Sequence, residues 1–255
     1  MPHFCGKAII FKLGWGTKLT VGKSMDEESL PIHKAAHDGD VAALRRELDD
    51  GVSPDAVDST HGFAPLHYLC GGAEGGDRVA CINLIIARGA NVNAGNAANV
   101  PPLQFAIINH PEFVPLLLDA GADPNYTIGD QSALHYAFFT SQYDSRVVKA
   151  MVEALISAGA DVNLRNRAGV TPLEAGIFSR NMDKMYPIFF RAGAALPTGT
   201  SVAYVQKIRA AGGFKRYERN HLNAITATFA PKLSHLLPSE LVRRVVEYAF
   251  HVGDY

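Results

Sequence analysis

The chain lacks the residues that build covalent frameworks or cross membranes. Its 255 residues include three cysteines, Cys5, Cys70 and Cys81, and no C-x-x-C pair. An odd count without that spacing favours reduced thiols over a disulfide framework. No apolar run reaches the length of a membrane span, and Lys7 and Lys12 interrupt the apolar N-terminal residues, which makes a poor signal peptide. We therefore expect a cytoplasmic or nuclear protein without a membrane anchor.

A strong net charge is also absent. Charged residues make up 19% and hydrophobic residues 47%, with a net charge of −1, which argues against disorder and against a whole-molecule attraction to nucleic acid. The charge is uneven, because residues 198–255 hold eight Lys and Arg against four Asp and Glu, while residues 1–197 hold 16 and 21. This basic tail permits an anionic partner, but a few cations on two helices are more typical of a solvated face. We do not expect nucleic acid as a partner. The best candidate for such contact is the basic cluster of Lys207, Arg209, Lys215, Arg216 and Arg219.

Recognisable catalytic patterns are missing as well. The sequence contains no Ser-His-Asp or Cys-His set with a known local signature. Carboxylate pairs such as Asp49-Asp50 end a solvated helix, where no apolar pocket raises a pKa. We therefore expect no enzymatic activity and no cofactor.

The N-terminal residues 7–23 alternate apolar and polar side chains around Gly14-Trp15-Gly16, which predicts a short β-hairpin or leader within residues 1–29. Two other interpretations are weaker. Gly16 to Gly22-Lys23-Ser24 resembles a phosphate-binding loop, but the spacing is one residue too long. Residues 14–21 are similar to an immunoglobulin joining strand, but no variable domain precedes them.

A recurring junction organises the residues that follow. Gly159-Ala160-Asp161-Val162-Asn163, then Thr171-Pro172-Leu173-Glu174, places a helix-ending glycine and a polar turn before a new helix. The same pattern follows Gly51, Gly89 and Gly121. Its Leu or Ile anchors are spaced 34, 37, 31 and 39 residues apart, and they are Ile32, Leu66, Leu103, Leu134 and Leu173. Such a period is the signature of a repeat array.

The units resemble the ankyrin repeat, whose period is about 33 residues and whose signature is T-P-L-H-x-A. The resemblance covers residues 30–197 and implies five helix–turn–helix units. Proline in the first helical turn costs no hydrogen bond, paired alanines allow close helix packing, and the second helices carry apolar stripes that stack on the next unit. The fold class is therefore an all-α ankyrin-repeat solenoid.

The sequence departs from the repeat pattern at the motif histidine and at two insertions. The motif histidine is present as His33, His67 and His135 but is replaced by Gln104 and Glu174. His33 and His37 have metal-ligand spacing, yet no third ligand is near and the motif histidine usually bonds to backbone, so we expect no metal. Insertions near residues 71–76 and 140–145 lengthen the loops on one edge, which is more often variation than a site.

Residues 198–255 predict three helices that form a C-terminal cap, because the last unit of an array must cover its apolar stripe. The segment is similar to one attached to ankyrin arrays in algal proteins, through motifs such as Tyr217-Glu218-Arg219 and Phe229-Ala230-Pro231-Lys232. Residues 237–248 also resemble the first helix of an F-box. An alternative function is therefore a substrate receptor of a ubiquitin ligase.

The ankyrin resemblance implies a surface for binding another protein at the hairpin tips and on the exposed side of the first helices. In the repeat pattern, these positions do not contribute to the hydrophobic core. Large apolar groups there are therefore candidates for partner contact. The tip candidates are Thr60, His61, Phe63, Val100, Ile128, Gln131, Arg167 and Val170. The helix candidates are His37, Ile108, Phe139 and Phe178. We expect a non-enzymatic interaction scaffold, monomeric by itself or a subunit of a larger complex.

Overall fold

The computed structural model describes residues 30–72, 75–138, 143–178, 182–198, 200–233 and 238–252. The chain divides into two compact units, residues 1–181 and 182–255. The division falls inside the fifth repeat, whereas the sequence places the domain boundary after residue 197. The hairpin expected at residues 7–23 lies outside the described residues.

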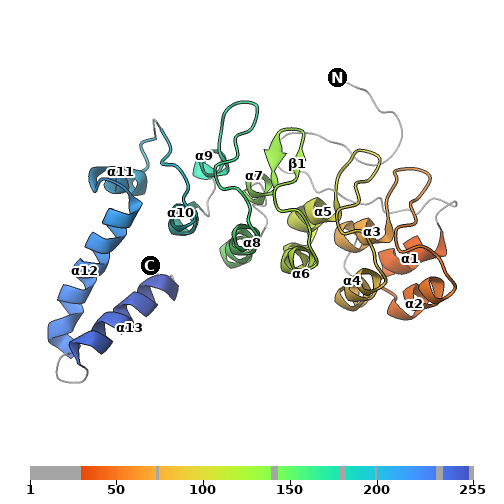
Figure 1. Cartoon of the computed structure of the whole chain (residues 1–255), viewed down its shortest axis with the longest axis horizontal. Coiled ribbons are helices and arrows are strands. Elements are labelled where there is room, and N and C mark those ends of the chain that lie inside the picture. The colour runs from red at the N-terminus through yellow and green to blue at the C-terminus, as the bar shows by residue number, and fades with distance from the viewer. Residues whose placement is uncertain are drawn as a thin grey trace. The chain divides into compact units, whose positions relative to one another are not determined.

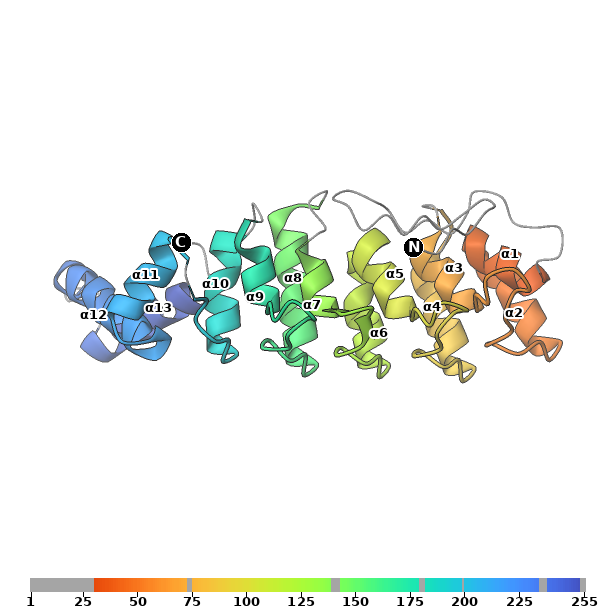
Figure 2. The ribbon, with the colours of Figure 1, turned by 90° about the horizontal axis from the view of Figure 1, so that it is seen from above.

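The first unit is an array of helix pairs. In Figures 1 and 2 the first helices of successive repeats lie side by side, and so do the second helices. The pairs are α1 (Pro31–Asp38) with α2 (Val41–Asp49), α3 (Pro65–Gly71) with α4 (Arg78–Ala87), α5 (Pro102–Asn109) with α6 (Val114–Asp119), and α7 (Ala133–Ala137) with α8 (Ser145–Ser157). Short 3₁₀ turns η1 (Pro111–Phe113) and η2 (Gly176–Phe178) precede α6 and follow α9 (Pro172–Ala175). A short hairpin, β1 (Thr127–Ile128) and β2 (Gln131–Ser132), pairs Thr127 with Ser132 and Ile128 with Gln131.

The residues that begin and end these helices behave as the sequence predicts. Prolines occupy the first turns of α1, α3, α5 and α9. The predicted helix-ending glycines all have positive φ angles, and Gly159 has the largest, at 93°. A Cβ on Gly159 would meet no atom within 4 Å, so its left-handed conformation rather than lack of space requires glycine.

The core of the array lies between the two layers of helices. Ala35, Ala36 and Ala106 are buried, which lets the first helices of neighbouring repeats approach closely. The second helices contribute apolar residues that are also buried, and these are Leu44, Leu48, Leu84, Ile85, Leu117, Val152 and Leu155. The predicted ankyrin-type solenoid is therefore confirmed.

The second unit contains α10 (Met182–Arg191), α11 (Ala203–Ala210), α12 (Phe214–Leu233) and α13 (Ser239–Val252). Aromatic rings join the first three helices, because Tyr186 stacks on Tyr204 and Phe190 lies against Phe214. The sequence predicts that the second of the tail's helices ends near Phe229, but α12 continues through Pro231. This expectation was wrong because a proline near the last turn removes a single helical hydrogen bond.

Helix α13 also departs from its predicted apolar face. Val242 and Val246 are buried, whereas Leu241 and Val245 are 42% and 50% exposed. Of the four residues of this face whose side chains the structure describes, two therefore face solvent.

The motif histidines link neighbouring repeats. His67 Nδ1 accepts the Ala64 N–H at 3.1 Å, and Nε2 donates to the Val100 carbonyl of the next repeat at 3.0 Å. His135 repeats this with Ser132 and Val170. In the third repeat the helix begins after Pro101, which has no N–H to donate, and the motif residue is Gln104. The buried Gln104 Nε2 has no hydrogen-bond partner among the described residues.

Replacing His67 by Gln tests the histidine link. Burial lowers the pKa of His67 from 6.5 to about 4, so the folded chain holds the ring neutral while the unfolded chain accepts a proton below about pH 6.5. Stability of the native chain should therefore fall as pH drops from 6.5 towards 4, by on the order of 3 kcal/mol from this group. His67→Gln should cost about 1–2 kcal/mol near neutral pH and show a flatter pH dependence in urea unfolding. The exposed His221→Gln is the control, and an unchanged pH slope in His67→Gln would contradict the account.

Restoring the link in the third repeat should stabilise the array. The double variant Pro101→Thr/Gln104→His supplies both the missing N–H and the missing ring. We expect the free energy of unfolding to rise by about 1 kcal/mol in urea denaturation. A lower stability than that of the native chain would show that the link does not transfer to this repeat.

Candidate functional site

The hairpin tips between repeats are closed by short polar side chains. Asp58 Oδ1 accepts the N–H groups of Thr60, His61 and Gly62 at 3.0, 2.6 and 3.0 Å. Asn96 and Asn166 each accept two N–H groups from their own tips in the same way. Side chains that hold a turn backbone like this fix its conformation before any partner binds.

Asp58 is the buried anion among these tip residues. Burial alone would raise the pKa of Asp58, but its hydrogen bonds from the His61 N–H, the Tyr68 hydroxyl and two further N–H groups bring the pKa below the usual 3.8. The Tyr68 hydroxyl donates to Asp58 Oδ2 at 2.7 Å. The carboxylate is therefore a charged structural anchor, with all its contacts inside the protein.

The inter-repeat loops are also joined to one another, at the turns that directly follow the second helices. Asn93 Nδ2 donates to the Gly121 carbonyl at 3.0 Å, and Asn93 Oδ1 accepts the Asp123 N–H at 2.8 Å. Asn125 makes the same two bonds one repeat later, to Gly159 and Asp161, at 2.9 and 2.7 Å. Each of these asparagines ends one of the recurring sequence junctions. The recurring spacing therefore places it where it bonds to the backbone of the next repeat. Carboxylates add two further links, from Asp55 to the Asn91 N–H and from Asp130 to the Arg167 N–H.

Two predicted tip residues are part of the core. Phe63 and Val100 are 2% and 1% exposed. The Phe63 ring packs edge-on against Phe105 at 5.5 Å between centroids. The expectation that these side chains lie exposed was wrong, because Phe63 packs against Phe105 of the next repeat and Val100 is buried at the matching position two residues before its first helix.

The other described candidates retain solvent exposure. Thr60 and Arg167 are exposed, while the remaining residues are partly exposed, and these are His37, His61, Ile108, Ile128, Gln131 and Val170. Their backbones carry internal bonds: the His61 carbonyl accepts the Ala97 N–H, and the Arg167 N–H meets Asp130. Phe139 and the side chain of Phe178 lie outside the described residues.

The structure adds Val57 to this surface. Val57 is 58% exposed, more than any other large hydrophobic side chain among the described residues. It lies in the first tip, one residue before the anchor Asp58. The sequence signal was an apolar residue among turn formers, and it was missed because the first junction diverges from the others.

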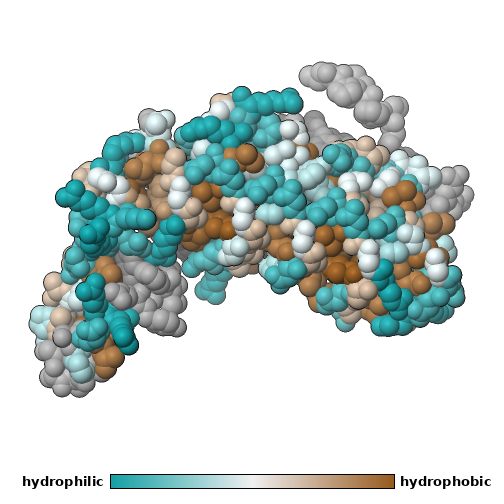
Figure 3. All heavy atoms as spheres, in the orientation of Figure 1, coloured by the Kyte–Doolittle hydropathy of each residue, from teal (hydrophilic) through white to brown (hydrophobic). Residues whose placement is uncertain are grey.

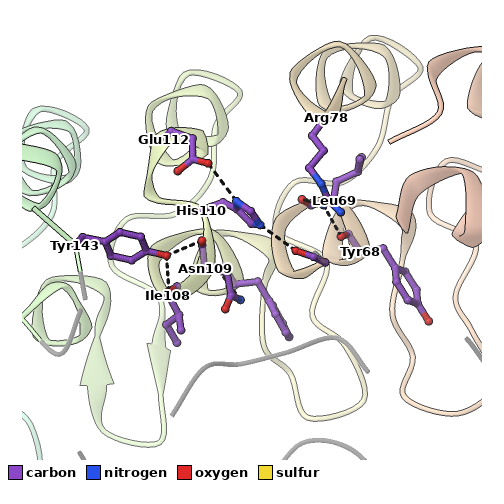
Figure 4. A network of polar contacts seen from close by, with 10 residues as sticks. Tyr68, Leu69, Arg78, Ile108, Asn109, His110, Glu112 and Tyr143 are labelled. Carbon is purple, nitrogen blue, oxygen red and sulfur yellow. Dashed lines mark hydrogen bonds and ion pairs between the residues drawn. The ribbon is translucent and has the colours of Figure 1, made fainter. Parts of the chain in front are cut away.

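A second set of links follows the opposite edge, where the first helices end. Arg78 Nη1 donates to the Tyr68 and Leu69 carbonyls at 3.0 and 2.5 Å, and Nη2 donates to the His37 carbonyl of the preceding repeat at 2.8 Å. Figure 4 shows Arg78, His110 and Tyr143 aimed at helix-end carbonyls. The last carbonyls of a helix lack intrahelical partners, so these side chains satisfy them.

The inserted loops supply part of this edge. His110 Nε2 bonds to the Gly72 carbonyl at 2.9 Å while its Nδ1 meets Glu112 at 3.1 Å. The Tyr143 hydroxyl, from the second insertion, donates to the Asn109 carbonyl at 2.6 Å. A Cβ on Gly72 would lie 2.6 Å from Arg78 Nη2, so glycine there makes room for the guanidinium. The insertions thus connect repeats, a role that the sequence did not indicate.

The described residues offer little chemistry beyond recognition. Within the described ranges, no group of three or more His, Cys, Asp or Glu side chains is placed to hold a metal ion. Burial raises the pKa of Cys70 to about 12 and that of Cys81 to about 11, so both thiols stay protonated and unreactive near neutral pH. Within the same ranges, no helix combines the length and the apolarity of a membrane span.

Removing Arg78 should destabilise the array. Arg78→Ala removes the guanidinium donor from two buried carbonyls and one partly buried carbonyl, so we expect a loss of about 2–4 kcal/mol in urea unfolding. Gly72→Ala should produce part of this loss by displacing the guanidinium. The control is Arg88→Ala, which removes a partly exposed ion pair with Asp49 and should cost less than about 1 kcal/mol. Equal losses in Arg78→Ala and Arg88→Ala would contradict the structural role of Arg78.

Comparison with known proteins gives the same repeat pattern. Residues 69–166 match the family model for ankyrin repeats, in three copies. A putative ankyrin repeat protein of fowlpox virus (strain NVSL) is 37% identical over 93 residues, which are 35% of this chain and 15% of the viral protein. An ankyrin repeat protein of variola virus is 29% identical over 136 residues, or 51% of this chain and 23% of that protein.

Alpha-latrocrustotoxin-Lt1a of Latrodectus tredecimguttatus is 24% identical over 169 residues, which are 62% of this chain and 12% of the toxin. The chain therefore spans less than a quarter of the length of each of these relatives. The similarity of the C-terminal segment to algal proteins stays a prediction. The recurrent helix pairs, the histidine links and the family match together show that this chain is an ankyrin-repeat protein.

Proposed function

We propose that this chain is a non-enzymatic scaffold or adaptor that binds a partner protein through its hairpin tips and the adjoining first helices. Ankyrin repeats are protein–protein interaction modules, which supports the general class of function. The identity of the binding residues and the adaptor role go beyond the family and rest on the geometry of the tips.

The observation that carries the proposal is the combination of a fixed tip backbone with exposed side chains. Asp58 holds the backbone of its own tip, and Asp130 joins its tip to Arg167 in the next. Val57, Thr60 and Arg167 nevertheless remain exposed. A surface whose backbone is ordered before binding loses little conformational entropy on association, so its side chains contribute more of their contact energy to affinity.

The composition of the surface fits a protein partner. Figure 3 shows hydrophobic residues in small patches among hydrophilic ones on the visible face of the array. Interfaces of this kind combine a few apolar anchors with a polar rim. Val57 and Ile128 provide apolar groups in two different tips, and Arg167 provides a charged group in a third. The pattern supports recognition at several separated points rather than in one pocket.

Removing these groups together should separate binding from folding. We expect the triple variant Val57→Ser/Ile128→Ser/Arg167→Ser to retain its thermal stability within a few degrees, because its side chains are exposed or partly exposed. Its capture of partner proteins should fall about tenfold or more, measured by affinity purification with quantitative mass spectrometry.

The matched control removes exposed apolar groups from second helices of the same array. Val79 in α4 and Val147 in α8 are both exposed, so Val79→Ser/Val147→Ser changes similar surface away from the tips. This variant should retain the partners. Equal loss of the same partners in both variants would contradict the proposed tip surface.

The alternative function, a substrate receptor of a ubiquitin ligase, would use α13 for recruitment. The exposed Leu241 and Val245 are the observation relevant to it. Removing residues 236–255 distinguishes the two functions. If α13 is a cap, the truncated chain should lose cooperative unfolding of the array. If it is a recruiting helix, the array should remain folded and a cullin adaptor should be lost from purified complexes.

A further inference from the structure

Helix α12 presents a face of hydrogen-bond donors, and the cations of this face make no hydrogen bond or ion pair with the residues that the structure describes. Lys215, Arg216 and Arg219 are exposed, and so are Asn220 and Asn223. At 3.6 residues per turn these five positions fall on one arc of about 140°, and they extend about 12 Å along the helix. The single acidic residue of α12, Glu218, accepts a hydrogen bond from Arg191 Nε at 2.9 Å and lies outside this arc.

Two neighbouring cations, on α11, have structural explanations. Lys207 and Arg209 lie in the last turn of α11, where the helix dipole favours positive charge. Arg209 Nη2 also donates to the Pro197 carbonyl at 2.7 Å. Their presence therefore requires no ligand.

On α12, by contrast, Lys215, Arg216 and Arg219 carry an electrostatic cost. They occupy its first turns, where the helix dipole disfavours positive charge, and no acidic residue lies in the first turn. Lys215 and Arg219 are also four residues apart, a spacing at which like charges repel on a helix. The Arg216 side chain lies over Gly212, whose absent Cβ would be 3.6 Å from Nη1. Unfavourable local charge interactions that the rest of the fold does not offset are expected at functional sites.

From this face, defined by Lys215, Arg216, Arg219, Asn220 and Asn223, we propose a second binding surface that takes a short acidic segment of a protein. Guanidinium groups and amides match carboxylates, and about four residues of extended chain cover 12 Å. This surface goes beyond the proposed tip site and does not depend on it.

Two observations favour an acidic peptide over nucleic acid. The nearby aromatic rings are engaged with each other, since Tyr204 packs against both Tyr186 and Tyr217, which leaves them unsuited to stack on bases. Residues 1–197 carry more acidic than basic residues, 21 against 16, which opposes a long polyanion more than a short peptide.

Fluorescence anisotropy with the full chain tests this surface. The probe is a fluorescein-labelled peptide of about eight glutamates, compared with a glutamine peptide of equal length and a labelled DNA duplex of about 20 base pairs. We expect the glutamate peptide to bind, with an affinity that falls between about 50 and about 200 mM salt. The variant Lys215→Gln/Arg216→Gln/Arg219→Gln should weaken binding about tenfold.

A matched variant removes three array cations, Lys34→Gln/Arg45→Gln/Arg146→Gln, and should retain the affinity. The α12 variant should also melt at the same temperature as the native chain or slightly higher, because it removes the repulsion within the helix. Absence of peptide binding, equal loss in the matched variant, or tighter binding of the duplex would overturn the proposal. A large drop in the melting temperature of the α12 variant would overturn it too, because the cations would then be structural.

Discussion

The structure depends on hydrogen bonds that one repeat cannot complete alone. Side chains of one repeat bond to the backbone of its neighbours at both edges of the array. In the loops, Asn125 accepts the Asp161 N–H, and at the ends of the first helices Arg78 donates to the His37 carbonyl. Buried backbone groups without partners cost free energy, so each repeat is stable only in the stack. The helices bury the apolar surface, but these polar links at both edges set the register between repeats.

The same kind of bond bears on the proposed tip surface. Asp58 accepts N–H groups of its own tip, and Asp130 accepts the Arg167 N–H of the next tip, so the conformation of these tips does not depend on a partner. The second unit shows the opposite arrangement, since its aromatic rings join α10, α11 and α12 while cations remain on the outer face of α12. The two proposed surfaces therefore differ in chemistry, mixed on the array and basic on the second unit.

Much of the fold could be predicted from the sequence because each feature has a local cause. The prolines, the glycines with positive φ and the alanine pairs are properties of single positions, so their spacing gave the repeats. Exposure at the tips could not be predicted in the same way, since the direction of Phe63 or Val100 depends on the next repeat. The role of Tyr143 was also missed, because an insertion carries no periodic signal. In α13, Leu241 and Val242 are adjacent and both hydrophobic, yet Leu241 is exposed and Val242 is buried. This difference depends on packing and could not be predicted from residue type.

The central claim is that links between repeats fix the tips before a partner binds. Residue-resolved hydrogen exchange of the free protein tests it most directly, at the N–H groups of the inter-repeat loops and tips that bond to the preceding repeat. These belong to Asn91, Ala97, Asp123, Asp161 and Arg167. The account predicts that they exchange as slowly as amides within the array's helices, because both open only when repeats separate. Exchange at the rate of an open loop would show that the tips are not preorganised, and the account would be contradicted.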